Sequence, residues 1–268
     1  MNTRNTLNWF KITKQKDYLY VIQESLDKIE PRFLTNFINL YLILGTHSAL
    51  LIDTGCGLFP LKPVIQDLIS NKKLIVVNTH SHFDHIGGNS EFDTVRVHEK
   101  ELNEISVPTD ISFLKNSPKE ITKRYEKINY TFQPCRNIQS LKTDSIIDLG
   151  EVSVKIIHTP GHSSGSISLL TNKNELFTGD TAHYGTMYLS KDEIPILLSS
   201  ISKLLAVCQV SENIEIYPSH EIYGINKKLL TDLSESIQKI DRLWETKKWD
   251  KFLEGWVIYD INFAYVVF

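Results

Sequence analysis

Three histidines and one aspartate fall within six consecutive positions of this 268-residue chain, at His80, His82, Asp84 and His85. Imidazole and carboxylate groups are ligands that divalent zinc, iron and manganese accept. An apolar run at residues 74–77 precedes them and predicts a buried strand. Side chains alternate along an extended segment, so His80 and His82 point to the same side and can bind one metal ion. Asp84 and His85 follow a predicted turn and can face a second ion beside the first.

Four further segments carry residues suited to such a site, at 51–55 (LIDTG), 159–162 (TPGH), 177–180 (FTGD) and 217–220 (YPSH). Together with the H-x-H-x-D-H pattern of residues 80–85, they resemble the motifs of the metallo-β-lactamase-fold metal-dependent hydrolases, a superfamily that includes glyoxalase II. All five segments occur in the order that is typical of this family.

The resemblance implies seven metal ligands, which are His80, His82, Asp84, His85, His162, Asp180 and His220. The first two and His162 would hold one divalent ion, Asp84, His85 and His220 the other, and Asp180 would bridge the pair. The ions would be zinc, with iron or manganese as alternatives, because histidine and aspartate accept all three. Two-metal hydrolases hold their ions ~3.5–4 Å apart and use a hydroxide formed at neutral pH as the nucleophile. Asp84 would also orient this nucleophile and receive its proton.

Other residues near the motifs are candidates for supporting roles. In some relatives a tyrosine close to the bridging carboxylate polarises the substrate carbonyl, and here His183 or Tyr184 could do so, with loop packing as the alternative. Asp53 ends a predicted strand, and such a carboxylate commonly fixes the tautomer of a histidine ligand. Ser163 follows the predicted ligand His162 and could do similar work.

The ligand set favours some branches of the resembled family over others. Classical zinc β-lactamases have a cysteine where this chain has Asp180. Segments 53–58, 82–88 and 160–167 resemble most closely the acyl-coenzyme A thioesterase subgroup of metallo-β-lactamase-domain proteins. The leading hypothesis is therefore a dinuclear hydrolase of a small-molecule ester or thioester, with an acyl thioester as the substrate. The alternatives are a lactonase or phosphodiesterase, a mononuclear iron persulfide dioxygenase, or an inactive binding module, against which the retention of all seven ligand types argues.

Composition narrows the class of protein further. The content of 41% hydrophobic and 23% charged residues is typical of a globular protein, and a net charge of −3 gives no reason to expect a nucleic-acid partner. We expect no membrane span and no signal sequence, since no apolar run is long enough. The three widely spaced cysteines predict neither a disulfide framework nor a cysteine zinc site, which favours a cytoplasmic location.

Periodicity predicts strands at 18–23, 36–44, 49–52, 74–77, 95–98, 145–149, 152–157, 166–170, 175–178 and 214–217. It predicts helices at 63–69, 118–128 and 195–207, and one amphipathic helix from residue 230 to residue 244. This pattern fits an α+β fold, a four-layer αββα sandwich of two mixed sheets flanked by helices, in a single domain over residues 1–268. Residues 106–143 would form a cap insertion over the site, or an ordinary connection. The variable segment 249–268 would contain one strand at 259–267, and the C-terminal elements could form a homodimer contact.

Overall fold

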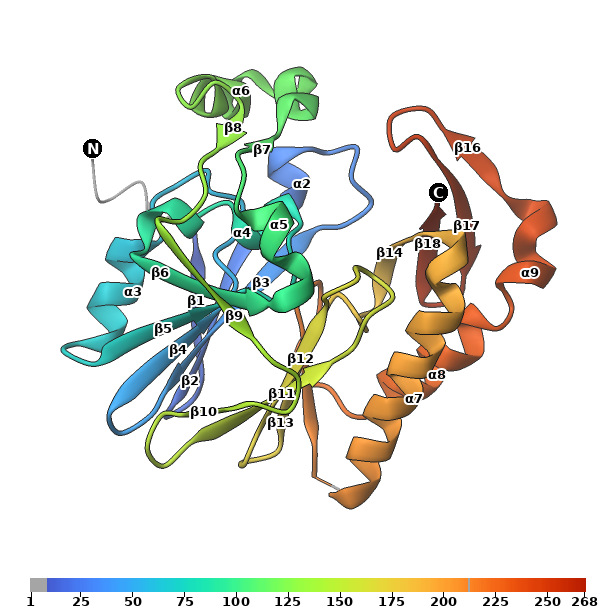
Figure 1. Cartoon of the computed structure of the whole chain (residues 1–268). Coiled ribbons are helices and arrows are strands. Elements are labelled where there is room, and N and C mark those ends of the chain that lie inside the picture. Colours follow the sequence, from blue (N-terminus) through green and yellow to red (C-terminus); the bar gives the residue numbers. More distant parts are fainter. Residues whose placement is uncertain (1–8, 212) are drawn as a thin grey trace.

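Two β-sheets face each other at the centre of the molecule in the computed structural model, which describes residues 9–211 and 213–268 (Figure 1). The first sheet has seven strands in the order β1 (Lys11–Lys16), β2 (Leu19–Ser25), β3 (Phe37–Leu44), β4 (Ser48–Ile52), β5 (Lys73–Val77), β6 (Thr94–His98) and β9 (Asn137–Leu141). The strands from β1 to β4 are antiparallel and those from β4 to β9 are parallel, so the sheet is mixed.

The second sheet has five strands in the order β10 (Ile146–Asp148), β11 (Ser153–His158), β12 (Ile167–Thr171), β13 (Glu175–Gly179) and β15 (Glu215–Pro218). Only the last pair is parallel. A separate four-stranded sheet continues this side of the molecule, in the order β14 (Gly185–Leu189), β18 (Phe263–Val267), β17 (Gly255–Asp260) and β16 (Lys248–Asp250).

Three aromatic side chains pack together in the core between the two main sheets. Tyr41 comes from β3, Phe177 from β13 and Tyr217 from β15, and all are buried. The ring centroids of Tyr41 and Phe177 are 4.9 Å apart, and those of Phe177 and Tyr217 are 5.3 Å apart. Aromatic pairs at these separations add to the burial energy of the rings. This cluster joins the sheet that carries the H-x-H-x-D-H loop to the sheet that carries Asp180.

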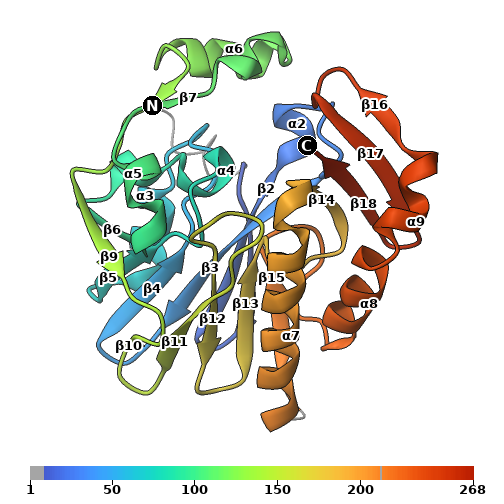
Figure 2. The ribbon, with the colours of Figure 1, turned by 45° about the vertical axis from the view of Figure 1, so that its right-hand side comes forward.

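Helices cover the outer faces of the sheets (Figure 2). Helix α3 (Lys62–Ile69) packs Val64 and Ile65 against the first sheet. Helices α7 (Ile194–Val210) and α8 (Lys228–Ile237) pack against the second sheet and the four-stranded sheet. The predicted α+β sandwich of two mixed sheets between helices is therefore confirmed.

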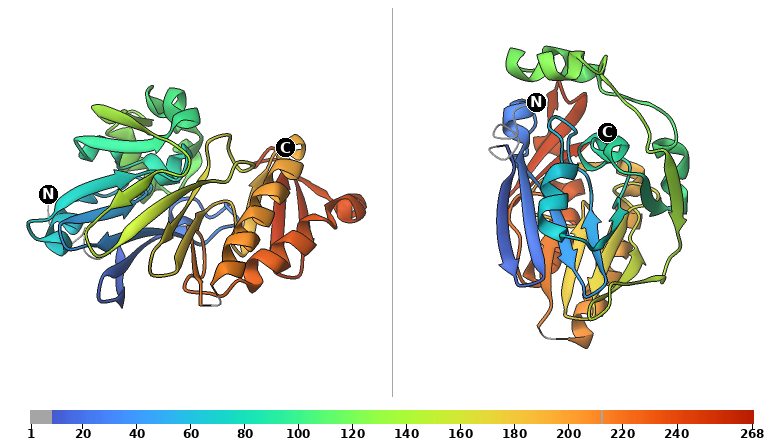
Figure 3. Two further views of the ribbon diagram at one scale, coloured as in Figure 1. Left: turned by 60° about the horizontal axis from the view of Figure 1, so that its bottom comes forward. Right: turned by 90° about the vertical axis from the view of Figure 1, so that its left-hand side faces the viewer.

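The segment from 106 to 143 leaves the sandwich at one end and returns to it as the edge strand β9. It contains β7 (Thr109–Asp110), a 3-10 turn at Ser112–Asn116, helix α6 (Lys119–Glu126) and β8 (Thr131–Phe132). Figure 1 and the right-hand view of Figure 3 both show α6 at the upper end of the molecule, beyond the main sheets.

Two sequence predictions about the C-terminal region are wrong in detail. The single helix expected at 230–244 is divided, because α8 ends at Ile237 and a short helix α9 (Ile240–Leu243) follows. Ile237 and Ile240 both face the same core, so the apolar period continues across the break and hides it. The single strand expected at 259–267 is a hairpin, in which β17 ends at Asp260 and β18 begins at Phe263. The Asp260 side chain accepts the N–H of Ile261 and shapes this turn.

One helical segment, Lys191–Val210, is long and apolar enough to cross a membrane by length and composition alone, with a mean hydropathy of 1.5. Core helices of globular proteins pass the same test. Leu197, Ile201 and Leu204 of this segment are fully buried against the sandwich, and Ser200 donates a hydrogen bond to the Pro160 carbonyl at 2.7 Å. These contacts give the segment a role within the fold.

Replacing Phe177 by alanine tests the importance of the aromatic cluster. Removing a fully buried aromatic side chain should lower the free energy of unfolding by about 3–5 kcal/mol, since it leaves a cavity between the sheets. Val210→Ala is the control, because Val210 is 91% exposed and its truncation should change stability by less than about 0.5 kcal/mol. Urea denaturation followed by circular dichroism measures both, and equal stability of the two variants would contradict this description of the core.

Candidate metal centre

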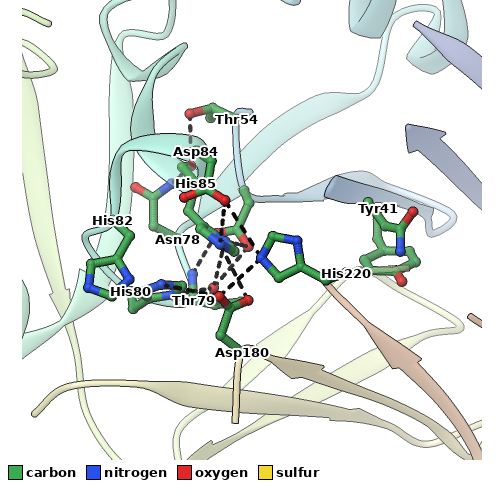
Figure 4. A network of polar contacts seen from close by, with 12 residues as sticks. Tyr41, Thr54, Asn78, Thr79, His80, His82, Asp84, His85, Asp180 and His220 are labelled. Atoms are coloured by element: carbon green, nitrogen blue, oxygen red, sulfur yellow. Dashed lines mark hydrogen bonds and ion pairs between the residues drawn. The ribbon is translucent and has the colours of Figure 1, made fainter. Parts of the chain in front are cut away.

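The predicted ligands come from four separate segments, which follow strands β5, β11, β13 and β15 and meet at one side of the sandwich. His80 and His82 lie in the loop after β5, and helix α4 (Phe83–Ile86) carries Asp84 and His85. Loops after β11, β13 and β15 bring the remaining three, which are His162, Asp180 and His220. Figure 4 shows six of the seven side chains pointing toward one another around Asp180.

The first group of ligand atoms belongs to three histidines. His162 Nε2 lies 2.8 Å from His82 Nδ1 and 3.1 Å from His80 Nε2. His82 thus presents its Nδ1 atom to the group, whereas the other two present Nε2. One ligand atom from each of the three lies within 4.8 Å of the others, as one shared cation requires.

The second group contains Asp84, His85 and His220. Asp84 Oδ2 lies 3.7 Å from His85 Nε2 and 3.6 Å from His220 Nε2. Asp180 reaches both groups, because its Oδ2 is 3.1 Å from His220 Nε2 and 3.4 Å from His162 Nε2, and its Oδ1 is 3.3 Å from His85 Nε2. A carboxylate in this position can bridge two ions.

Two buried ligand atoms, His85 Nε2 and Asp180 Oδ1, have no hydrogen-bond partner among the described residues. Buried polar atoms are nearly always paired, so these two need an explanation. The Nδ1 atom of His85 faces the carboxylate of Asp53, so the opposite ring nitrogen, Nε2, is directed toward Asp180. Lone pairs of histidine and carboxylate that converge in a buried place fit divalent cations.

The electrostatics differ among the histidine ligands, since some are kept neutral, as cation binding requires, whereas the pKa of His85 is raised well above its usual range, despite burial, by Asp180, Asp84 and Asp53. Burial lowers the pKa of His80 and His162 well below the usual histidine range and keeps both rings neutral. Burial opposes ionisation of Asp180, but His220 and His85 outweigh it and hold the pKa of this carboxyl well below its usual range. Burial also works against a charge on His220, yet Asp180 raises its pKa to about 9. Because a cation and a proton compete for the same lone pair, metal binding would release this proton.

Asp53 lies where the sequence analysis expected it, beside a histidine ligand. This fully buried residue follows β4 with a φ of 62°, and its Oδ2 accepts the Nδ1 proton of His85 at 2.8 Å. Its Oδ1 accepts the backbone N–H of Thr79 at 2.7 Å, and Oδ2 also accepts the Thr79 hydroxyl at 2.9 Å. The carboxylate therefore fixes both the tautomer of His85 and the start of the loop that carries His80.

Ser163 contacts no ring and acts through a residue that the sequence analysis missed, Glu101. The Ser163 hydroxyl donates to Glu101 Oε1 at 2.7 Å, and the Gly165 N–H donates to the same atom at 2.6 Å. The hydroxyl of Ser81 donates to Glu101 Oε2. Glu101 thus ties the loop of His82 to the loop of His162. Its neighbours Glu99 and Glu104 are acidic as well, so composition gave no signal that Glu101 alone would be buried.

Gly161 permits the close approach of the His162 loop to α7. Its φ is 125°, and a Cβ at this position would lie 2.4 Å from the backbone nitrogen of Leu197. Only glycine adopts such a backbone without strain.

The Tyr184 side chain is directed toward α8 and Phe263, which favours the loop packing that was the alternative to a catalytic role. Its ring stacks on Phe263, and its hydroxyl donates to Asp232 of α8 at 2.8 Å. His183 is buried beside His220, with ring centroids 5.1 Å apart, and its Nδ1 donates to the Tyr184 carbonyl at 2.9 Å. Burial lowers the pKa of His183 to about 4, so this ring is neutral and packs behind the ligand His220.

A pocket of about 270 Å³ opens over the ligands and has a mostly apolar wall. Five of the predicted ligands form its floor, namely His82, Asp84, His162, Asp180 and His220. The residues of its wall are Leu26, Phe33, Thr35, Phe83, Phe113, Thr186, Tyr188 and Phe268. Phe113 belongs to the segment 106–143. The pocket can therefore hold an apolar group beside the metal ligands.

Replacing Asp53 by asparagine should weaken metal binding about 10- to 100-fold. The asparagine amide can donate to His85 Nδ1 and so favour the tautomer that carries its proton on the ligand nitrogen. Competition with a chromophoric chelator measures zinc affinity. Asp17→Asn is the control, because the Asp17 side chain is 99% exposed, and an affinity loss equal to that of the control would contradict the role of Asp53.

Replacing Glu101 by glutamine should lower the free energy of unfolding by about 1.5–3 kcal/mol, since three hydrogen bonds to a buried carboxylate are weakened. Glu104→Gln is the matched control on the adjacent helix α5 (Leu102–Ile105), where the side chain is exposed and the effect should stay within about 0.5 kcal/mol. Denaturant titration of metal-free protein separates the two. Indistinguishable midpoints would show that Glu101 does not hold the loops together.

Comparison with known proteins places this geometry in a family. The family model of the metallo-beta-lactamase superfamily matches residues 35–230. Acyl-coenzyme A thioesterase MBLAC2 of Gallus gallus is 30% identical over 221 residues, which cover 76% of each chain. The mitochondrial hydroxyacylglutathione hydrolase of Saccharomyces cerevisiae is 29% identical over 228 residues, covering 78% of this chain and 72% of that relative.

Solved structures share the fold. A metallo-beta-lactamase family protein of Thermus thermophilus aligns with a TM-score of 0.64 at 18% identity, over 90% of this chain and 87% of that chain. All seven predicted ligands lie within the matched residues 35–230. The chain therefore belongs to the metallo-beta-lactamase superfamily and is one of its metal-dependent hydrolases.

Proposed function

We propose that this protein hydrolyses acyl thioesters at a dinuclear metal centre, with zinc as the metal. The observation that carries the proposal is the convergence of two ligand groups on the shared carboxylate of Asp180, at the floor of an apolar pocket. Similarity to the thioesterase of Gallus gallus and to the hydroxyacylglutathione hydrolase supports a thioester as the substrate class.

His80, His82 and His162 would hold one ion, Asp84, His85 and His220 the other, and Asp180 both. Bound divalent ions supply a hydroxide nucleophile at neutral pH and stabilise the oxyanion that forms on the acyl carbon. Overall, the water oxygen forms a bond to the acyl carbon, the carbon–sulfur bond breaks, and the products are a carboxylic acid and a thiol.

Asp84 is the ligand best placed to handle the proton of the attacking water. It is 8% exposed, lines the pocket, and lies beside both histidines of its group. His183 is not among the residues that line the pocket, and its Nδ1–H donates a hydrogen bond to the Tyr184 carbonyl. We therefore assign His183 to holding His220 in place and not to proton transfer.

The apolar wall of the pocket would hold the acyl chain. Phe33 and Phe83 have ring centroids 5.8 Å apart, and Phe83 and Phe113 have ring centroids 5.2 Å apart. Phe113 would make the segment 106–143 a cap that contributes to substrate binding. Each buried methylene contributes about 0.8 kcal/mol, which corresponds to roughly a fourfold gain in kcat/KM while the chain still fits.

We place this reaction in the cytoplasm, acting on a small-molecule substrate. All three cysteines are free and buried, which supports a reducing compartment. A net charge of −3 supports neither a nucleic-acid substrate nor a polyanionic surface partner.

Thioester hydrolysis is tested with zinc-loaded protein and straight-chain acyl-coenzyme A thioesters of increasing length. We expect two zinc ions per chain and kcat/KM values that rise by roughly fourfold per methylene until the pocket is full. Asp180→Asn keeps the shape of the bridging residue but removes its charge, and it should lose more than about 100-fold in kcat together with metal.

Other results would overturn the proposal in distinct ways. If the metal-loaded protein hydrolyses thioesters no faster than the Asp180→Asn variant, thioester hydrolysis is excluded and lactones and phosphodiesters become the candidate substrates. One iron per chain, with oxygen consumption on glutathione persulfide, would establish the dioxygenase alternative. Protein that binds no metal would be a binding module.

A further inference from the structure

A buried carboxylate that the proposed reaction does not use lies behind the wall of the pocket. Glu30 follows helix α2 (Leu26–Ile29) and is 1% exposed. Burial opposes ionisation of Glu30, but hydrogen bonds from Arg32 and Ser117 outweigh it and lower the pKa of this carboxyl. Glu30 is therefore charged, and a buried charge is tolerated only when it is paired.

The first partner of Glu30 belongs to the segment 106–143. The Ser117 hydroxyl donates to Glu30 Oε2 at 2.7 Å, and Ser117 directly follows the 3-10 turn Ser112–Asn116, which carries Phe113. Hydrogen bonds from Ser112 to Asp110 and from Ile111 to Tyr130 stay within the segment, whereas the bond from Ser117 leaves it. Glu30 thus ties the turn that carries Phe113 to the main body of the protein.

The second partner of Glu30, Arg32, extends the contact to the C-terminal hairpin. Arg32 Nε donates to Oε1 at 2.7 Å and Arg32 Nη2 donates to Oε2 at 2.6 Å, a two-pronged pair that fixes both groups. The guanidinium carbon lies 3.7 Å from the ring centroid of Phe252, in the turn between β16 and β17, where the ring attracts the cation. Figures 1 and 2 both show α2 between α6 and the β16–β17 hairpin. We call Glu30, Arg32 and Ser117 the clamp, because together they join three parts of the chain.

The clamp lies behind a cluster of phenylalanine rings. Phe33 follows Arg32 in the chain, and its ring centroid is 5.8 Å from that of Phe252, 5.8 Å from that of Phe83 and 6.3 Å from that of Phe113. Phe33, Phe83 and Phe113 line the pocket. Phe113 is 41% exposed, so its packing is incomplete and its place in the wall depends on how its turn is held.

We propose that Glu30 is a positioning residue that holds the aromatic wall closed around the acyl chain, and that it thereby sets how strongly the enzyme distinguishes long from short acyl groups. This inference rests on the proposed thioesterase function and deepens it. Without the bond from Ser117, the turn that carries Phe113 can move away from Phe33 and Phe83. A protein whose closed wall is populated only part of the time binds its ligand more weakly by that fraction. The loss falls on binding of the apolar chain, because the clamp holds the wall and not the metal ligands.

The test measures kcat and KM of zinc-loaded protein on coenzyme A thioesters of increasing chain length. Glu30→Gln keeps the size of the side chain and removes its charge, so it should raise KM for the longest accepted ester about tenfold. The change in kcat should stay below about twofold, as expected when only binding is lost. The effect on KM should shrink as the acyl chain shortens. Glu126→Gln is the matched control on α6, where the side chain is exposed, and should behave as wild type.

Ser117→Ala is a milder variant that keeps the pair between Glu30 and Arg32, and it decides the question if Glu30→Gln does not fold. It should raise KM for the longest ester by about twofold to tenfold. Ser112→Ala is its control, because that hydroxyl bonds to Asp110 within the segment and its loss should leave KM unchanged. The double variant of Glu30 and Ser117 should lose less than the product of the single losses, since both changes remove one shared contact.

Hydrogen exchange of the zinc-loaded protein tests the clamp without any turnover. In Glu30→Gln and Ser117→Ala, the backbone amides of residues 111–117 should exchange about tenfold faster than in wild type, because the turn opens more often. The amides of β3 and β4 should exchange as in wild type, since these strands lie in the main sheet.

The possible outcomes separate the clamp from the proposed function. Equal losses on all esters, with faster exchange throughout the molecule, would assign Glu30 to global stability and overturn the proposal. Kinetics and exchange equal to those of Glu126→Gln would overturn it as well. If wild-type protein hydrolyses no thioester, the proposed function fails, and unchanged exchange at residues 111–117 would reject the clamp independently.

Discussion

The structure depends on one electrostatic constraint: five imidazoles and two carboxylates must converge at the floor of one pocket, where most of them are buried. Without a cation, Asp180 is the group that makes this possible, since its charge lies 3.1 Å from His220 and 3.3 Å from His85. Charges in a buried site interact strongly, so the arrangement is stable only while opposite charges remain paired. Cations at the two ligand groups would meet this requirement directly, because each would replace a bound proton. The protein therefore pre-organises ligands that are costly to hold together without metal.

A site of this kind cannot be built from one flexible loop. The sandwich meets the constraint by taking the ligands from the ends of four strands, β5, β11, β13 and β15, and by fixing these loops through further contacts. Asp53 holds His85, the Phe37 carbonyl holds His220, and Glu101 ties the loops of His82 and His162 together. These supporting contacts are themselves buried, so they lose little to competition with water. Rotation of the His85 or the His220 ring would leave a partner unpaired, which explains how the fold selects one orientation for these two rings.

The sequence could predict those parts of the fold and site that have a local signal. Alternation and turn residues located most strands of the two main sheets, and the histidine pattern located the ligand loop, because both depend on neighbours within a few positions. Residues whose role arises only from tertiary contacts were not predictable. In the sequence, the buried Glu101 cannot be told apart from neighbouring glutamates that are exposed. Tyr184 has the sequence position of a site residue, but its hydroxyl donates to Asp232 of α8. The hairpin at Asp260 was hidden for a related reason, since alternation continues through a tight turn.

Part of the pocket wall comes from outside the portion of the chain that holds the metal ligands. All seven ligands lie within residues 35–230, the part that matches the superfamily. Leu26 and Phe33 precede this part and Phe268 follows it, yet all three line the pocket. Tyr188 lies within the matched part, but it is held in a sheet whose other three strands, β16, β17 and β18, lie beyond it. Similarity over the common part therefore supports a metal-dependent hydrolase, while the proposed selectivity for an acyl group would depend in part on side chains outside that part.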